Sequence, residues 1–313
     1  MKLVFFLTLM SGGFFFGGPN SYGQGCCSAS GRAAQVGVFD QSQKPPGQVS
    51  FSVYYEHVRA RRPLLGDREV ADPLSRRSKF RSLVYTISVG LPWGLSAHGV
   101  VSNVKRQRSF VARIGLKDTT VSLVGNGFSD PVISLIKGIT PYYGWRGWYL
   151  SAGSGLKVPL GTDEQREEGV LLPADVQPAT GSWDLMFLAS VSKTLTSFIV
   201  YNYLTWTISG INTTSYKFGN SVNADIGLSW SGLWKLEPFI RMDLLYLKPD
   251  QKTGRVLPST GSTRWNIYPG LVLSFPSNGL TLSGQFGIPV YEKVEGNQLG
   301  TNTSVIIGLS IVP

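Results

Sequence analysis

Residues 220–230, NSVNADIGLSW, alternate apolar and polar side chains without interruption. In an extended strand, Val222 and Ile226 share one face and Asp225 lies on the other, because strand side chains alternate with a period of two. In a soluble sandwich the apolar face would be the protein core, whereas in a membrane barrel it would meet lipid and the polar face would line the interior. This one segment leaves both interpretations open.

The same alternation recurs along the chain and predicts about twelve strands. Most of the segments run to about eleven residues or more, which exceeds the typical globular strand of about five or six and matches a tilted strand that spans a bilayer. The segments that we expect to be strands are 48–59, 80–91, 94–105, 130–140, 145–158, 183–194, 197–209, 219–230, 234–248, 264–275, 279–291 and 303–312.

Short and long connections alternate between these segments. An up-and-down membrane barrel predicts this alternation, because its turns are short at one end and its loops are long at the other, whereas a Greek-key sandwich gives no reason for it. The stretch 106–129 is expected to be one of the long loops. The short connections, several of which carry turn-forming Gly, Pro, Ser or Asn, are PWG (92–94), TPYYG (140–144), LTS (195–197), SGLW (231–234) and FPSN (275–278).

Composition favours the membrane interpretation. Charged residues make up 15% of the 313-residue chain, against roughly 25% in an average soluble protein. After the N-terminus no apolar run reaches the length of a membrane-spanning helix, about 18 residues, so a barrel is the structure that could cross a bilayer. Aromatic residues near the strand ends suit an interfacial girdle, although sandwich cores can also end in aromatic residues; they are Trp93, Tyr142, Tyr143, Trp145, Trp148, Trp183, Trp230, Trp234 and Trp265.

We therefore expect an all-β fold, a transmembrane up-and-down antiparallel β-barrel of about 12 strands over residues 48–313. Residues 222–230 would then face lipid with their apolar side chains and the interior with their polar ones. Residues 1–23 are expected to be a signal peptide, since Lys2 precedes an apolar stretch and small residues precede Gln24. Residues 24–47 are expected to form a flexible N-terminal segment.

The two cysteines, Cys26 and Cys27, lie just after the predicted cleavage site. Lipid modification of Cys26 is an alternative, but YGQGC lacks the small aliphatic residues expected before a lipoprotein cysteine. Soft-metal binding is another, but two thiolates without nearby histidines make an incomplete site. The favoured interpretation is an oxidised or solvent-exposed pair in a flexible arm.

The net charge is +10, and much of it lies in residues 59–81, RARRPLLGDREVADPLSRRSKFR. A basic stretch of this length has three interpretations: a nucleic-acid site, a site for anionic lipid headgroups, or a solvated loop. Export of the chain disfavours nucleic acid. Between the other two interpretations, the solvated loop is favoured.

Residues suited to catalysis or metal binding are sparse. His57 and His98 are far apart, and a metal site needs more ligands at workable spacing, so both are expected to be satisfied or interior-facing side chains. No G-x-S-x-G elbow occurs, and GNGFSD (125–130) precedes a strand rather than the helix that a phosphate cradle uses. We expect no enzyme activity, no metal and no cofactor, with an outer-membrane hydrolase as the alternative.

Three stretches resemble one family of bacterial outer-membrane proteins. Residues 155–193, GLKVPLGTDEQREEGVLLPADVQPATGSWDLMFLASVSK, resemble its Leu-Pro and Gln-Pro-x-Thr-Gly-Ser-Trp-Asp pattern; residues 286–310, FGIPVYEKVEGNQLGTNTSVIIGLS, resemble its C-terminal hairpin, and GCCSAS resembles its cysteine signature. The family comprises outer-membrane transporters of the phenol-degradation meta-pathway type. The resemblance implies a barrel that passes small aromatic or hydrophobic molecules, and it implies no catalytic residue. One departure is the ending SIVP, because outer-membrane barrels usually end on an aromatic residue.

These observations predict a passive channel in the bacterial cell outer membrane, with outer-membrane lipid, lipopolysaccharide and a small-molecule solute as partners and no nucleic acid. The alternative is a structural barrel with a closed lumen that docks a partner through outer loops such as GTDEQREEG (161–169). If the SGLW turn leaves the register symmetric about Gly232, Asp225 lies diagonally from Arg241, within reach of its side chain. The residues expected to line the lumen are Asp184, Asp225, Glu237, Arg241, Asp243 and Arg264.

Overall fold

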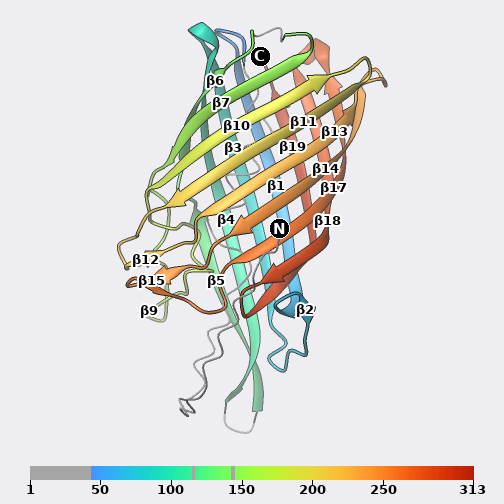
Figure 1. Ribbon diagram of the computed structural model, residues 1–313. Helices are drawn as coiled ribbons and strands as arrows, with labels where there is room; N and C mark the ends of the chain where they lie inside the picture. Colours follow the sequence, from blue (N-terminus) through green and yellow to red (C-terminus); the bar gives the residue numbers. More distant parts are fainter. Residues whose placement is uncertain (1–43, 115–116, 142–144) are drawn as a thin grey trace, which may run out of the picture.

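The computed structural model describes residues 44–114, 117–141 and 145–313. Within this part of the chain, twelve strands form a closed antiparallel barrel, in which each strand pairs with the next barrel strand along the chain. The last strand pairs with the first, for example Gly308 with Tyr54, and so closes the sheet (Figure 1). The predicted signal peptide and the Cys26–Cys27 pair lie outside the described residues.

Each barrel strand overlaps one of the segments predicted from the alternation, so the predicted fold is confirmed. The barrel strands are β1 (Val49–Leu65), β3 (Arg77–Leu91), β4 (Leu95–Ile114), β6 (Val132–Gly138), β7 (Trp148–Lys157), β10 (Asp184–Thr194), β11 (Phe198–Ser209), β13 (Ser221–Trp230), β14 (Leu236–Leu247), β17 (Ser262–Phe275), β18 (Leu280–Val294) and β19 (Asn297–Ile311). The remaining strands are β2 (Arg68–Glu69), β5 (Lys117–Phe128), β8 (Arg166–Glu167), β9 (Val170–Leu171), β12 (Tyr216–Lys217), β15 (Gln251–Lys252) and β16 (Arg255–Val256).

Short connections gather at one end of the barrel, the short-turn end, and most long ones at the other, the long-loop end, where β5, β12 and β15 lie (Figure 1). The connection from β18 to β19, expected to be a long loop over KVEGNQLGTNT (293–303), is instead the two-residue turn 295–296 at the long-loop end. Two connections at the short-turn end are single 3₁₀ turns, Pro92–Gly94 and Pro276–Asn278. Gly279 follows the second turn at φ 60°, a left-handed conformation that glycine adopts without steric cost. No helix among the described residues is long and apolar enough to cross a membrane.

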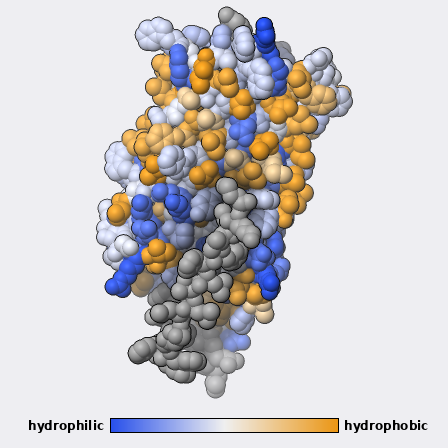
Figure 2. Space-filling model, viewed as in Figure 1, coloured by the Kyte–Doolittle hydropathy of each residue, from blue (hydrophilic) through white to orange (hydrophobic). Residues whose placement is uncertain are grey.

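Side chains of the barrel strands alternate between a buried inward face and an exposed outward face. On β13, Asp225 is 2% exposed and Ile226 is 45% exposed, which confirms the predicted assignment of faces. Apolar side chains cover much of the middle of the visible wall, and hydrophilic ones are more frequent toward its ends (Figure 2). Exposed tryptophans follow both rims, as in an interfacial girdle: Trp93, Trp145, Trp148, Trp230 and Trp234 near the short turns, and Trp183 and Trp265 near the long loops.

The stretch 106–129 is largely strand, so its prediction as a loop is wrong. β4 continues to Ile114 and β5 runs back along it, with Phe128 paired to Asn103. The two strands form a hairpin that extends past the barrel rim (Figure 1). Because the hairpin lies beyond the apolar band, no lipid contact requires apolar residues at alternate positions, and the sequence therefore lacks the signal that marks the other strands.

The basic stretch 59–81 is also not a solvated loop over most of its length. β1 continues through Leu65, and β3 begins at Arg77. Between them, Arg76 is buried, with its Nε atom 2.9 Å from Asp72 Oδ1 and its Nη2 atom donating to Asn297. Most of the cations of this stretch therefore lie on strands, where neighbouring strands determine their surroundings.

Candidate functional site

The barrel interior is the candidate site, because polar and charged side chains of many strands meet there. All six residues expected to line the lumen occupy inward-facing strand positions. That they line a path for a solute stays a prediction. The exposed fractions are 1% for Asp184, 2% for Asp225, 5% for Arg241, 7% for Asp243 and 3% for Arg264, and Glu237 is half-buried near the short-turn end.

A charged cluster lies on the inward face of β13 and β14. Arg241 Nη1 lies 2.5 Å from Asp225 Oδ1, and Asn223 Nδ2 donates to Asp225 Oδ2 at 2.9 Å. On the neighbouring pair of strands, Asn266 Nδ2 donates to Asp243 Oδ1 at 3.1 Å. Because burial of a charge is costly unless the charge is paired and hydrogen-bonded, these contacts are what allow carboxylates and a guanidinium to share the interior.

The contact between Asp225 and Arg241 forms although the register differs from the one expected. Arg241 pairs with Gly227, and Asp225 pairs with Asp243, so the hairpin is symmetric about Trp234 rather than Gly232. Asp225 remains two residues from the partner of Arg241, and therefore keeps the diagonal position that a long side chain reaches.

A set of contacts runs through the interior at the level of Arg241. The guanidinium carbon of Arg241 lies 4.3 Å from the centre of the Tyr268 ring. Tyr268, on β17, belongs to an apolar cluster with Ile306, Tyr54 and Val84, which lie on β19, β1 and β3, two to four strands away in the closed order. These side chains therefore take up part of the interior at this level.

The rings of two tyrosines lie flat against the wall, because each faces a glycine on a neighbouring strand. Tyr54 is paired with Gly308, and a Cβ atom on that glycine would come within 2.5 Å of the ring. The same holds for Tyr201, since a Cβ on Gly227 would lie 2.1 Å from its ring. Only a glycine leaves room for a ring over the sheet at these positions, so the faces of the rings, not their edges, turn toward the bore.

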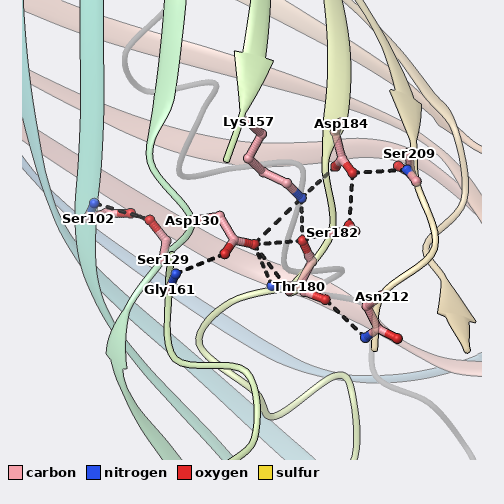
Figure 3. A network of polar contacts seen from close by, with 12 residues as sticks. Ser102, Ser129, Asp130, Lys157, Gly161, Thr180, Ser182, Asp184, Ser209 and Asn212 are labelled. Atoms are coloured by element: carbon pink, nitrogen blue, oxygen red, sulfur yellow. Dashed lines mark hydrogen bonds and ion pairs between the residues drawn. The ribbon is translucent and has the colours of Figure 1, made fainter. Parts of the chain in front are cut away.

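A buried polar network attaches the loop 158–183 to the barrel wall at the long-loop end (Figure 3). Lys157, the last residue of β7, points between two carboxylates, with its Nζ atom 2.5 Å from Asp184 Oδ2 and 3.9 Å from Asp130 Oδ2. The same nitrogen donates to Thr180 Oγ1. Ser182 Oγ donates to Asp184 Oδ1 at 2.9 Å, so the lysine and both carboxylates are hydrogen-bonded.

Asp130 connects the two ends of that loop. Its Oδ1 atom accepts a hydrogen bond from Gly161 N at 3.1 Å, and its Oδ2 atom accepts bonds from Thr180 N at 2.8 Å and Gly181 N at 3.1 Å (Figure 3). Backbone donors aimed at one carboxylate hold two distant points of a loop in a single arrangement. The loop is therefore built as part of the wall.

The middle of the loop reaches β4. Asp175 Oδ2 lies 3.1 Å from Arg108 Nη1, and the backbone oxygen of Asp175 accepts a bond from Arg106 Nη1 at 3.5 Å. Val176 and Ala179 are buried at 1% and 2% exposure. Contacts with inward-facing side chains of β4, β7 and β10 thus hold this loop against the wall at the long-loop end.

Sequence reasoning missed Asp130 and Lys157. A signal for Lys157 was present, because it shares strand parity with Ser151 and Gly155, which face inward. The same signal was present for Asp130, which begins the predicted segment 130–140 and shares parity with Ser134, which faces inward.

Arg264 is paired within the interior. Its Nε atom lies 3.1 Å from Glu292 Oε1, and the other oxygen of Glu292 accepts a bond from Thr301 N at 2.8 Å. Both side chains of the pair are almost fully buried. The guanidinium is therefore part of the wall near the long loops.

A second set of hydrogen bonds joins the loop 210–220 to the loop 248–261 at the long-loop end. Tyr216 OH donates to Asp250 Oδ2 at 2.6 Å, and Gly219 N donates to Asp250 Oδ1 at 2.7 Å. Burial raises the pKa of Asp250, although these two hydrogen bonds act in the opposite direction. Burial also raises the pKa of Tyr216, and the neighbouring Asp250 adds to that shift.

The histidines take different environments. His98 is buried at an inward position and its Nδ1 lies 2.9 Å from Ser88 Oγ. His57 lies on the outward face of β1, where its Nε2 atom accepts a hydrogen bond from Arg59 Nε at 2.9 Å. Among the described residues, no group of three or more His, Cys, Asp or Glu side chains could hold a metal ion.

The barrel resembles solved bacterial outer-membrane proteins. An outer-membrane channel from Pseudomonas putida F1 is 16% identical at a TM-score of 0.64, over 88% of this chain and 98% of that one. The translocator domain of the autotransporter NalP from Neisseria meningitidis is 9% identical at a TM-score of 0.50, over 90% of this chain and 94% of that one. The monoaromatic hydrocarbon channel CymD is 7% identical over 87% of this chain and 90% of that one, but at a TM-score of 0.45 the likeness carries no argument.

At such low identities the likeness shows the fold alone. The chain is a closed, twelve-stranded antiparallel β-barrel that resembles bacterial outer-membrane proteins, including an outer-membrane channel. No protein-family model matches the chain, and no curated protein matches it. Its relation to the phenol-degradation meta-pathway type is therefore still a prediction.

Proposed function

We propose that the protein is an outer-membrane channel for the passive passage of small solutes. The observation that carries the proposal is the distribution of polarity: the outward face of the barrel is apolar, and the inward face is polar and charged. A barrel in lipid has this distribution, with a polar interior suited to a water-filled path. The long-loop end would face the outside of the cell, since outer loops are long and periplasmic turns short.

The solutes that fit best are aromatic or hydrophobic compounds. Tyr54 and Tyr201 turn ring faces toward the bore, and stacking between rings favours aromatic molecules. The resemblance of residues 155–193 and 286–310 to the meta-pathway transporters supports the same class of solute and supports membership of that family.

A second candidate is a docking barrel with a closed lumen. It is favoured by the contacts that run from Arg241 through Tyr268 to Tyr54 and take up part of the interior. A docking protein could keep these contacts permanently.

The test compares two adjacent tyrosines of β1 in planar-bilayer recordings. Tyr54 faces inward and Tyr55 outward, at 6% and 41% exposure. If the barrel is a channel, Tyr54→Ala raises the single-channel conductance and Tyr55→Ala leaves it at the wild-type value. If neither the wild type nor Tyr54→Ala conducts, the channel is excluded and the docking barrel is supported.

A further inference from the structure

We infer that the outer wall formed by β1, β3 and β4 binds the phosphate groups of lipid A, the phosphorylated glycolipid anchor of lipopolysaccharide. The inference rests on the outer-membrane placement proposed above, and it does not depend on whether the lumen conducts. The binding surface, which we name the basic patch, consists of Arg59, Arg77, Lys79, Arg81 and Lys105, at outward-facing positions near the long-loop end.

Acidic side chains of the barrel strands face one way only. Within the described residues, every acidic side chain on a barrel strand lies at an inward position; these are Glu56, Asp184, Asp225, Glu237, Asp243 and Glu292. Outward positions carry cations and no acid. A wall of this kind cannot neutralise its charge within the protein and is complementary to an anionic lipid layer.

Cations of the basic patch lie beside one another across three strands. Lys79 is directly opposite Arg59 of β1, and Arg81 is directly opposite Lys105 of β4. Side chains so placed have Cβ atoms about 4.5–5.5 Å apart, and like charges at that spacing repel each other. The folded barrel therefore contains a local repulsion that an anion bound over the wall would relieve.

No cation of the basic patch forms an ion pair with an acidic side chain of the described residues. Two outward cations at the short-turn end differ, because each lies over the ring of a tryptophan. Lys193 Nζ lies 4.9 Å from the centre of the Trp148 ring, and Lys235 Nζ lies 4.1 Å from that of Trp234. Within the described part of the chain, no aromatic ring lies over a cation of the basic patch; Arg59 Nε donates to His57 Nε2, and the charge of the patch remains available to a ligand.

The level of the basic patch on the wall selects a lipid as that ligand. On β3 the outward Leu83 is followed toward the long loops by Arg81, and on β1 the outward Tyr55 is followed by His57 and then Arg59. The patch thus begins where the apolar surface ends, at the level that headgroups of the outer leaflet occupy. A phosphorylated lipid can cover the apolar surface with its acyl chains while its phosphates meet the cations, which a soluble anion cannot do.

The experiment titrates the purified full-length protein with bis-phosphorylated lipid A, with dephosphorylated lipid A and with inorganic phosphate, and follows binding by native mass spectrometry. The test variant is Arg59→Gln/Lys79→Gln/Arg81→Gln. The matched control is Lys137→Gln/Lys193→Gln/Lys235→Gln, which removes the same charge near the short turns. We expect the test variant to bind bis-phosphorylated lipid A roughly a hundredfold more weakly than the wild type, and the control variant to bind as the wild type does.

The inference is overturned if both forms of lipid A bind equally, if the test variant binds like the wild type, or if the control loses as much affinity. Displacement of lipid A by millimolar inorganic phosphate would also overturn it, because the site would then be one for free anions.

A gel-mobility shift on heating checks that each variant is folded. If the triple variant fails to fold, Lys79→Gln alone replaces it, with the rise in unfolding temperature on adding lipid A as readout; a rise equal to that of the wild type counts against the site. Failure of the channel proposal would be seen in the bilayer recordings and would leave the binding of lipid A unchanged.

Discussion

The walls at β13–β14 and at β1–β3, which lie opposite each other in the closed strand order, carry most of their charge on opposite faces. At β13–β14 the inward face holds Asp225 and Arg241, and the outward face is apolar. At β1–β3 the inward face holds Tyr54, Val84 and one acid, Glu56, whereas cations such as Lys79 occupy the outward face near the long loops.

The comparison shows two ways in which a barrel satisfies its charges. Inside, where water is scarce, a charge must find a partner on a neighbouring strand, and Asp225 and Arg241 do so. On the outer rim, a cation can be left without a protein partner, because lipid headgroups and water stabilise it there. Substitutions on the two walls should therefore have different costs.

The largest effect is expected at the inward wall. Arg241→Met leaves Asp225 buried without its cation and should lower the free energy of unfolding by about 3–5 kcal/mol, measured by urea unfolding in detergent micelles. The double variant Asp225→Leu/Arg241→Met should recover much of the loss. Arg81→Met on the opposite wall is the control, and its expected cost is below about 1 kcal/mol. Equal losses from Arg241→Met and Arg81→Met would contradict the contrast between the walls.

The next effect concerns the lipid-facing side of β13. Ile226→Arg should cost about 2–4 kcal/mol, the range found for cations near the bilayer midplane, because Ile226 is exposed to lipid. Ser229→Arg, on the inward face, should be far milder in the same unfolding assay. If the two substitutions destabilise the barrel equally, the assignment of faces is incorrect.

A smaller effect is expected at the loop network. Asp130→Asn removes the charge that the backbone donors of Gly161 and Thr180 bind, and should cost about 1–3 kcal/mol. Faster proteolysis within residues 158–183 would reveal the release of the loop. Glu164→Gln, an exposed change in the same loop, should leave the cleavage rate at that of the wild type. Unchanged cleavage of Asp130→Asn would show that the network does not hold the loop.

The smallest effect has the opposite sign. Lys79→Glu replaces a repulsion with Arg59 by an attraction, and should stabilise the lipid-free protein by about 0.2–1 kcal/mol. Lys193→Glu, whose lysine lies over Trp148, should not stabilise it. A loss of stability on Lys79→Glu in lipid-free detergent would argue that the patch carries no repulsion.

The alternation along the chain was sufficient to predict the class of fold and the faces of the strands. A bilayer requires an apolar side chain at nearly every outward position, so apolar and polar residues alternate with a period of two in each segment that spans it. The same reason explains the failure at β5, which lies beyond the apolar band of the wall and carries no such period. Parity also placed Arg241 and Asp243 on the inward face, and adjacency along one hairpin brought Asp225 within reach of Arg241.

Contacts between distant strands were decided by the tertiary structure alone. Pairing of β19 with β1 closes the barrel and brings Tyr54 into one apolar cluster with Tyr268, and the long loop brings Thr180 to Asp130. The sequence by itself determined which residues face inward and which face outward. It could not determine which inward residues meet, because that depends on the register of every strand pair and on the diameter that their combined stagger sets, and neither quantity is present in a local pattern.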